Sequence, residues 1–361
     1  MPESRIDGRV PNPGTGPAGP IIPELGFYTL AGQADSSREL VDEVRLAEAI
    51  GLGSVFVSER FDKKEAGVLS GAAGAVSERM TVVTAATNHN TRHPMITAGM
   101  ARTMQSLTGG RFVLGLGRGI PVIQDTYGIP RITTAQLEDF AGIMRRLFHG
   151  EAIIGHDGPA GSYPVLYLAA IDEELPLGLV AFGPESLALG GRCFDRVILH
   201  TFFTEETTRR CVTAVKDAAE RAGRDPDQVT VWSCLATIGD HVPEERRLMK
   251  SVGRLATYLQ GYGDLMVRTN GWDPAVLQRF RDDPVVSGFL GGIDSTATSP
   301  QLEHIATLIP ADWLAASATG SPGQCAAAVR SQLAMGCDGV IMHGATPEEL
   351  APVVTAYRTD G

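Results

Sequence analysis

The chain has 361 residues, of which 43% are hydrophobic and 20% are charged, so it holds enough apolar material for a folded core. The formal net charge of −11 argues against a nucleic-acid partner, because proteins that bind nucleic acids present a basic face. No apolar run reaches the roughly 18 residues of a membrane span, so we expect no membrane partner either.

The amino-terminal segment, residues 1–22, is rich in Gly and Pro and lacks the apolar stretch of a signal peptide. We expect a flexible tail there, followed by one domain over residues 23–361. No two cysteines form a C-x-x-C pair, so a zinc knuckle or a thioredoxin-type site is not expected. Reduced thiols in a cytoplasmic protein are the favoured interpretation of Cys193, Cys211, Cys234, Cys325 and Cys337.

Eight short apolar or β-branched runs, each bounded by Gly, Asp or Pro, are predicted to be strands. Alternation of strands with helices predicts a parallel sheet, and eight strands match a closed (β/α)8 TIM barrel, with an open doubly wound sheet as the alternative. The predicted strands are Glu24–Leu30, Ser54–Ser58, Met80–Thr87, Phe112–Gly117, Pro176–Phe182, Arg196–Thr201, Val229–Ile238 and Gly339–His343.

Helices are predicted between these strands from capping residues and from apolar spacing. Ser36 and Glu39 fit a capping box that opens a helix ending at Gly51. Further helices are expected from Pro94 to Gly109 and over 135–148. About 100 residues separate the last two strands, and residues 244–318 there are predicted to form a mainly helical insertion at the catalytic end of the barrel.

The glycines of Gly115-Leu116-Gly117-Arg118-Gly119 end the fourth strand. Their spacing is G-x-G-x-G and Pro121 follows, so they do not fit the G-x-G-x-x-G fingerprint of a dinucleotide site. Residues without Cβ would allow a flat cofactor to approach the backbone closely, and a tight turn without a ligand is the other possibility.

Polar residues collect at the predicted strand ends, and in a barrel these ends share one opening. His89, His200 and His343 could converge there, but H-x-H and H-E-x-x-H are absent, so no metal site is expected. His200 is expected to line a pocket, to act as a general acid or base, or to have a structural role. Arg60, Lys63 and Lys64 form the one dense basic cluster, which fits either a solvated loop or an anionic ligand.

Three patches together give the chain a family resemblance. Arg92-His93-Pro94 and the later run Gly109-Gly110-Arg111-Phe112-Val113-Leu114-Gly115-Leu116-Gly117 resemble the third-helix-to-fourth-strand signature of the bacterial luciferase-like monooxygenases. The segments from Ala181 to Arg192 and from Thr319 to Val340 are similar to the family's fifth strand and to its barrel closure.

The resemblance implies a barrel that binds FMN or the 5-deazaflavin coenzyme F420 at the strand carboxyl ends. The cofactor ring would rest on a bulge, often with a cis peptide, at positions matching Thr84 and Ala85. The phosphate would be held by backbone N–H groups after the fifth strand. The residues expected to bind the cofactor are Glu59, Arg60, Thr84, Ala85, Gly117, Arg118, Ala181, Phe182, Gly183, Pro184 and Glu185.

One departure from the family pattern affects the expected chemistry. Many members end the second strand with an acidic residue followed by His, whereas this chain has Glu59-Arg60. An arginine cannot act as a general acid near neutral pH, although it can bind an anion. The proton donor is therefore open, and the catalytic candidates are His200 and Glu59.

The function expected from these observations is hydride transfer between coenzyme F420 and a small, apolar organic substrate, in a cytoplasmic homodimer. The Arg60, Lys63 and Lys64 cluster suits the anionic tail of that coenzyme. Only four of the 31 basic Lys and Arg residues are lysines, which suits the GC-rich actinobacteria where the coenzyme is common. An FMN-dependent monooxygenase is the alternative, and a non-catalytic cofactor-binding barrel is the alternative of another class.

Overall fold

The computed structural model describes residues 19–31, 36–61, 63–171 and 174–359, so the predicted tail lies almost wholly outside them. Within these residues eight parallel strands form a ring, which closes because β9 pairs with both β8 and β11. This confirms the TIM barrel and excludes the open sheet, and each predicted run overlaps one barrel strand. The barrel strands are β1 (Ile22–Tyr28), β2 (Leu52–Val57), β3 (Thr81–Thr84), β4 (Phe112–Leu116), β7 (Leu177–Val180), β8 (Arg196–Ile198), β9 (Thr230–Gly239) and β11 (Gly339–His343).

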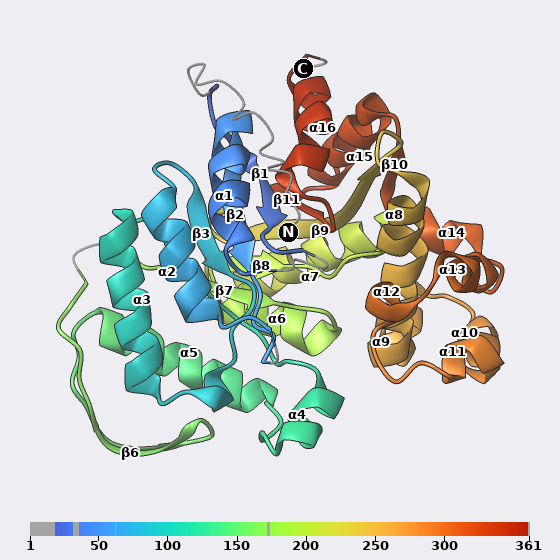
Figure 1. Cartoon of the computed structure of the whole chain (residues 1–361). Helices are drawn as coiled ribbons and strands as arrows, with labels where there is room; N and C mark the ends of the chain where they lie inside the picture. Colours follow the sequence, from blue (N-terminus) through green and yellow to red (C-terminus); the bar gives the residue numbers. More distant parts are fainter. Residues whose placement is uncertain (1–18, 32–35, 62, 172–173, 360–361) are drawn as a thin grey trace, which may run out of the picture.

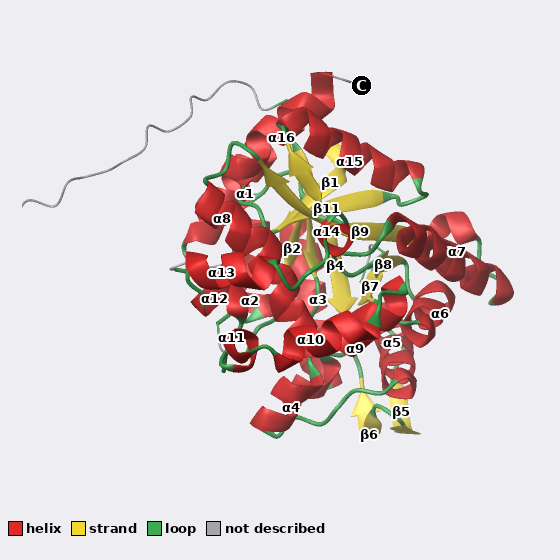
Figure 2. Ribbon diagram, turned by 90° about the vertical axis from the view of Figure 1, so that its right-hand side faces the viewer, coloured by secondary structure: helices red, strands yellow, loops and turns green. Residues whose placement is uncertain are grey.

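Helices surround the barrel, as Figure 2 shows. Gly51 ends the first helix with φ +92°, and Gly109 ends the third with φ +62°, both in the left-handed region that favours glycine. The helices around the barrel are α1 (Glu39–Ile50), α2 (Ala66–Val76), α3 (Pro94–Thr108), α4 (Pro121–Tyr127), α5 (Thr134–Phe148), α6 (Pro184–Cys193), α7 (Glu205–Arg221), α15 (Pro322–Ala334) and α16 (Pro347–Thr359), with short 3-10 turns at His89–Thr91 and Pro226–Gln228.

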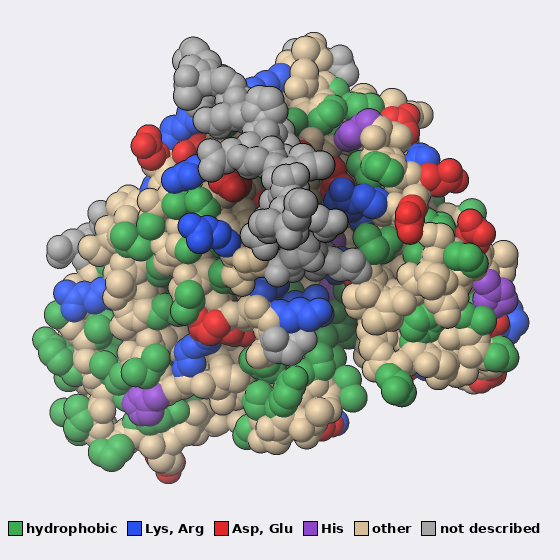
Figure 3. Space-filling view, in the orientation of Figure 1, with side chains coloured by type: hydrophobic (Ala, Val, Ile, Leu, Met, Phe, Trp, Pro, Cys, Tyr) green, Lys and Arg blue, Asp and Glu red, His purple; other side chains and the backbone are tan. Residues whose placement is uncertain are grey.

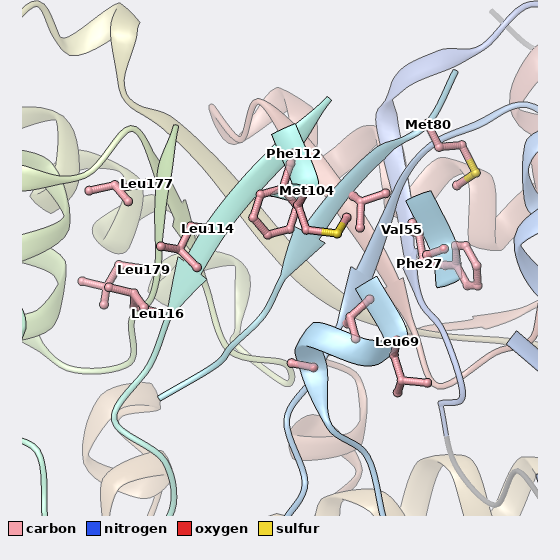
Figure 4. Close-up of a cluster of buried hydrophobic side chains, with 14 of the residues drawn as sticks. Phe27, Val55, Leu69, Met80, Met104, Phe112, Leu114, Leu116, Leu177 and Leu179 are labelled. Atoms are coloured by element: carbon pink, nitrogen blue, oxygen red, sulfur yellow. The ribbon is translucent and has the colours of Figure 1, made fainter. Parts of the chain in front are cut away.

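Alternation along the strands divides the core into two parts. Outward side chains such as Phe27, Val55 and Leu114 pack against the surrounding helices, and Figure 4 shows part of this layer. Inward side chains, among them Phe56 and Trp232, fill the barrel itself, with ring centroids 5.3 Å apart. The barrel is therefore packed through its middle, and a ligand has room only at an end.

Two elements were not predicted from the sequence. A hairpin of β5 (Ile153–Gly158) and β6 (Gly161–Leu166) lies between α5 and β7 and projects from the body in Figure 1. The short strand β10 (Ala318–Gly320) pairs with the end of β9. Both were missed because each is short and the hairpin buries few of its side chains, so its apolar pattern is weak.

The insertion between the seventh and eighth barrel strands is helical. Its interior includes Trp272 and Trp313, which stack with centroids 4.3 Å apart, and the buried Phe280. This cluster gives the insertion a core of its own beside the barrel. The insertion contains α8 (Glu244–Leu248), the π-helical segment η3 (Met249–Gly253), α9 (Arg254–Asn270), α10 (Pro274–Asp282), α11 (Pro284–Ser287), α12 (Ile293–Thr296), α13 (Ser299–Ala306) and α14 (Ala311–Leu314).

Candidate functional site at the mouth of the barrel

The floor of the barrel mouth is a bulge at the end of β3. Val83 pairs with Val113 and Thr87 pairs with Leu116, so four steps along one chain match three along the other. The peptide bond between Ala85 and Ala86 is cis. The sequence predicted a cis bond or bulge at Thr84–Ala85, so the cis bond lies one residue later than expected.

Thr84 does not face the mouth. Its hydroxyl accepts a hydrogen bond from Gly115 N at 2.8 Å and donates one to Gly115 O at 2.9 Å. This buried side chain completes the ladder where the bulge interrupts backbone pairing. Ala85, in contrast, faces the barrel interior beside Val83 and Val113. Of the two predicted ring-supporting residues, only Ala85 lies on the floor.

Gly117 lies directly against the bulge. A Cβ atom at this position would be 2.7 Å from the Cβ of Ala86, which is closer than real Cβ contacts. The glycine is required here by the close approach of β4 to the bulge, so the mouth has a floor of methyl groups and bare backbone. Gly117 was predicted to allow a close approach of the cofactor to the backbone. The structure shows a close approach at this position, but the approaching group is the Ala86 side chain.

Glu59 is tied into a network of hydrogen bonds beneath the floor. Its side chain is 5% exposed and accepts from the Thr87 hydroxyl at 2.7 Å, the Arg92 guanidinium at 2.9 Å and Ala66 N at 3.2 Å. Its backbone N–H donates to Ala86 O at 3.2 Å. These contacts make Glu59 a support for the bulge, because donors of the fold occupy three of the roughly four lone-pair positions of its carboxylate.

The basic cluster lies on the loop after β2, at the rim of the mouth. Arg60 is exposed, and its backbone pairs with Lys64 in a tight turn. The Lys64 ammonium group turns inward and donates to the Leu30 carbonyl at 2.9 Å. Burial, followed by the nearby Arg60 charge, lowers the pKa of Lys64 to about 8. Of the three cations in the cluster, Lys64 is engaged in the fold, whereas Arg60 and Lys63 are exposed and can meet an anion.

Arg118 joins the loop after β4 to the first turns of two helices. Its guanidinium contacts the hydroxyl of Thr134, which in turn donates to the Glu185 carboxylate at 3.2 Å. The Arg118 Nε atom is buried with no hydrogen-bond partner. Arg118 and Glu185 were both predicted near the cofactor, and the structure brings them to one side of the mouth through Thr134.

The segment after β7 forms the amino terminus of α6. The Ser186 hydroxyl accepts from the N–H groups of Phe182 and Gly183, at 3.1 and 3.2 Å. Ala181 is fully buried, whereas Pro184 and Glu185 are exposed. Two of the predicted phosphate donors are therefore capped by Ser186, and a phosphate would have to replace that hydroxyl or use the N–H groups of the next turn.

Aromatic and imidazole rings form one wall of the mouth. His200 lies 4.4 Å from Phe182, 4.8 Å from Tyr258 and 5.2 Å from Tyr262, measured between ring centroids. Tyr258 and Tyr262 belong to α9 of the insertion and stack on each other at 5.6 Å. Aromatic residues of the insertion can either cover the pocket or pack in the insertion's own core. These two tyrosines line the mouth, while Trp272 and Phe280 pack inside the insertion.

The opposite wall is built from β1, β11 and α9. His343 lies 5.4 Å from the Tyr28 ring, and its Nε2 atom is 3.4 Å from the Tyr258 hydroxyl. Arg254 forms an ion pair with Asp294, Nε to Oδ2, at 3.0 Å, and its positive charge lies near enough to Tyr258 to oppose the rise in the pKa of that hydroxyl that burial causes. The Tyr258 hydroxyl thus lies near an imidazole and a guanidinium.

These walls enclose a cleft. Tyr28, His200, Tyr258 and His343 are each partly exposed to solvent, yet burial raises the pKa of Tyr258 to about 12 and lowers that of His200 to about 4. These side chains are therefore largely withdrawn from water, although each keeps part of its surface in contact with solvent. Figure 3 shows a groove between the insertion helices and the barrel body, with hydrophobic side chains gathered over the neighbouring α4.

Two further polar residues have structural roles. Ser321 caps α15, where its hydroxyl accepts from Gln324 N and its own N–H donates to Oε1 of the Gln324 side chain. His89 stacks on Phe140 at 5.1 Å, apart from His200 and His343 at the mouth. Among the described residues, no group of three or more His, Cys, Asp or Glu side chains could hold a metal ion.

Three residues at the mouth were not singled out from the sequence. Tyr28 and Cys234 are inward positions of predicted strands, so alternation could have found them. Arg254 lies in a helix of the insertion, and only the packing of that helix against the barrel brings it to the site. Within the described part of the chain, no helix combines the length and the apolar character that crossing a membrane requires.

Comparison with known proteins agrees with this geometry. The chain is 26% identical over 250 residues to the 5,10-methylenetetrahydromethanopterin reductase of Methanolobus tindarius, covering 67% of this chain and 74% of that protein. Its fold is similar to the coenzyme F420 dependent tetrahydromethanopterin reductase of Methanopyrus kandleri, with a TM-score of 0.76, 17% identity, and coverage of 92% and 97% of the two chains.

The fold is also similar to an oxygenating enzyme that contains FMN. The type II Baeyer-Villiger monooxygenase component from Pseudomonas putida, solved in complex with FMN, gives a TM-score of 0.62 at 17% identity and covers 92% of this chain and 95% of that one. The family model described as luciferase-like monooxygenase matches residues 22–339. This chain therefore belongs to the luciferase-like monooxygenase family.

Proposed function

We propose that this protein is an oxidoreductase that transfers a hydride between coenzyme F420 and an apolar organic substrate at the barrel mouth. The observation that carries the proposal is the cleft itself: partly exposed aromatic and imidazole side chains surround a floor of Ala85, Ala86 and Gly117. Flat rings bind well to such floors, because no side chain projects from them.

The residues present fit the coenzyme in shape and in charge. Ala85 and Ala86 would support its ring, and the exposed Arg60 would meet its anionic tail. The loop from Gly183 to Glu185 would take the phosphate at the start of α6. When bound, a deazaflavin supplies hydride chemistry. The protein sets the distance and the face of the hydride transfer and excludes water from the site.

The comparison of folds supports F420 over FMN as the coenzyme. The M. kandleri enzyme is described as F420 dependent and has the higher of the two TM-scores reported above. An FMN-dependent monooxygenase is the second candidate, supported by the P. putida enzyme in complex with FMN. A phosphate at the start of α6 would suit either cofactor.

The test is a titration of the purified full-length chain with F420 and, separately, with FMN, followed by absorbance and fluorescence. We expect saturable F420 binding and oxidation of reduced F420 when a suitable acceptor is added. Tight FMN binding with oxygen consumption would support the monooxygenase instead. Binding of F420 without turnover of any acceptor would indicate a non-catalytic carrier.

A further inference from the structure

The mouth contains a hydroxyl that can deliver a proton. Tyr258 lies on α9 and is partly exposed to the cleft. Its oxygen is 3.4 Å from His343 Nε2 and lies within the field of the Arg254 guanidinium. Because guanidinium groups only donate, Arg254 leaves the tyrosine's own proton free for another acceptor.

The other acidic and basic groups near the mouth are engaged elsewhere. Glu59 is bound by Thr87 and Arg92 beneath the floor. Glu43 accepts from the Thr29 hydroxyl at 2.6 Å and from Leu30 N at 2.7 Å. These carboxylates are held by donors of the barrel, so neither presents a proton to the cleft.

His200 is also a poor donor at the mouth. Its Nδ1 lies 3.1 Å from the carbonyl oxygen of Thr201, which can only accept, so Nδ1 carries the proton of the neutral ring. Burial lowers the pKa of His200 to about 4, so the ring is neutral near pH 7 and its Nε2 is an acceptor. Among the described tyrosines of the mouth, Tyr258 is the one whose hydroxyl contacts His343 Nε2 and also lies near the Arg254 charge.

We propose that Tyr258 is the catalytic acid of a carbonyl reduction, and that the substrate is a ketone with an apolar or aromatic body. This inference rests on the proposed function, because the hydride comes from the reduced coenzyme. In the step, the carbonyl carbon gains the hydride and the C=O π electrons move onto oxygen. The Tyr258 O–H bond breaks as the new O–H bond forms, giving a secondary alcohol, oxidised coenzyme and tyrosinate.

The surroundings of Tyr258 favour this role. Burial raises the pKa of Tyr258, and the nearby Arg254 guanidinium offsets part of that rise by stabilising the tyrosinate. Rings of Phe182, His200 and Tyr262 surround the approach to Tyr258, and such rings suit an aromatic or aliphatic substrate body. The arrangement also supplies the proton donor that Arg60 cannot provide at the end of β2.

His343 is a positioning residue in this scheme. With its Nε2–H directed at the Tyr258 oxygen, it fixes the hydroxyl so that the phenolic proton points into the cleft. Its Nδ1 is buried without a partner, which is compatible with the Nε2–H form of the neutral ring. A glutamine amide can place an N–H near the same point, whereas a leucine of similar size cannot.

The first experiment measures carbonyl polarisation with acetophenone carrying a 13C-labelled carbonyl, bound to the full-length protein without coenzyme. Infrared difference spectra should show the carbonyl band shifted to lower frequency, as hydrogen bonding requires. Tyr258→Phe should abolish the shift, and Tyr262→Phe, which removes the neighbouring hydroxyl, should retain it. A missing shift in the native protein, or equal loss in both variants, overturns the assignment.

The second experiment measures reduction of acetophenone by reduced F420. Tyr258→Phe should lower kcat about 100-fold or more, the usual size of general acid catalysis, while F420 affinity stays unchanged. His343→Leu should lower kcat without raising KM, and His343→Gln should restore much of the loss. Equal effects of Leu and Gln would overturn the role of His343.

The two proposals fail in different ways. If the native protein does not bind F420, the proposed function fails, while the infrared result on the coenzyme-free protein still tests Tyr258. If F420 binds and acetophenone is reduced equally well by native protein and Tyr258→Phe, the proposed function stands and Tyr258 is not the acid.

Discussion

Replacing Glu59 tests whether its carboxylate supports the fold beneath the mouth. The side chain is 5% exposed and accepts three hydrogen bonds, from Thr87, Arg92 and Ala66. Hydrogen bonds to a buried charged group contribute about 1.5–3 kcal/mol each, and breaking a buried ion pair costs about 3–5 kcal/mol. Glu59→Gln keeps the shape and one acceptor, so we expect a loss of about 2–4 kcal/mol in the free energy of unfolding.

Glu65→Gln is the matched control. Glu65 contacts the same Arg92 guanidinium, but its side chain is 47% exposed. An exposed ion pair contributes about 0–1 kcal/mol because water screens it, and an amide can still cap α2. The two substitutions remove the same charge from the same partner, so burial is the main difference between them.

The assay is urea unfolding followed by circular dichroism for both variants. Combining Glu59→Gln with Arg92→Met in a double-mutant cycle should give a coupling energy of about 1–3 kcal/mol. Equal losses for the two glutamates, or a change below about 0.5 kcal/mol for Glu59→Gln, would refute the argument. It would also return Glu59 to the group of candidate acids at the mouth.

Three further outcomes are expected. Arg60→Ala should raise the F420 dissociation constant about tenfold, which is roughly 1.4 kcal/mol of binding free energy, and the loss of affinity should be smaller in high salt. Unchanged binding in a low-salt titration would contradict the placement of the anionic tail. Gly183→Val should weaken F420 binding but leave the melting temperature unchanged, because a Cβ at this position would contact only Leu265 Cδ1, at 3.8 Å. Glu185→Ala should bind F420 normally. The reverse pattern in parallel titrations of the two variants would place the phosphate elsewhere. Lys64 has a pKa of about 8, lowered by burial from 10.5, so the unfolded chain binds more protons between these values and stability rises with pH there. Lys64→Met should therefore gain stability relative to the native chain most clearly below pH 8, and urea midpoints across this range should show the advantage shrinking as pH rises.

The sequence by itself determined the barrel and the ends of many elements. Alternating apolar runs separated by helices specify parallel strands, and local signals such as Gly51, Gly109 and the Ser321 cap fix helix ends within a residue or two. These features depend on neighbours a few residues apart, so a linear pattern carries them. The family resemblance rests on the same kind of local pattern, and it located the mouth and the region of the bulge.

Tertiary structure alone decided what each site residue does. Glu59 and Thr84 are polar and lie at strand ends, yet both have structural roles. Glu59 is hydrogen-bonded to Arg92 and Thr87, and Thr84 is hydrogen-bonded to Gly115. Tyr258 lies 85 positions before His343 in the chain, and only the docking of α9 against the barrel brings them together. A side chain's partners depend on distances across the fold, and spacing along the chain does not encode those distances.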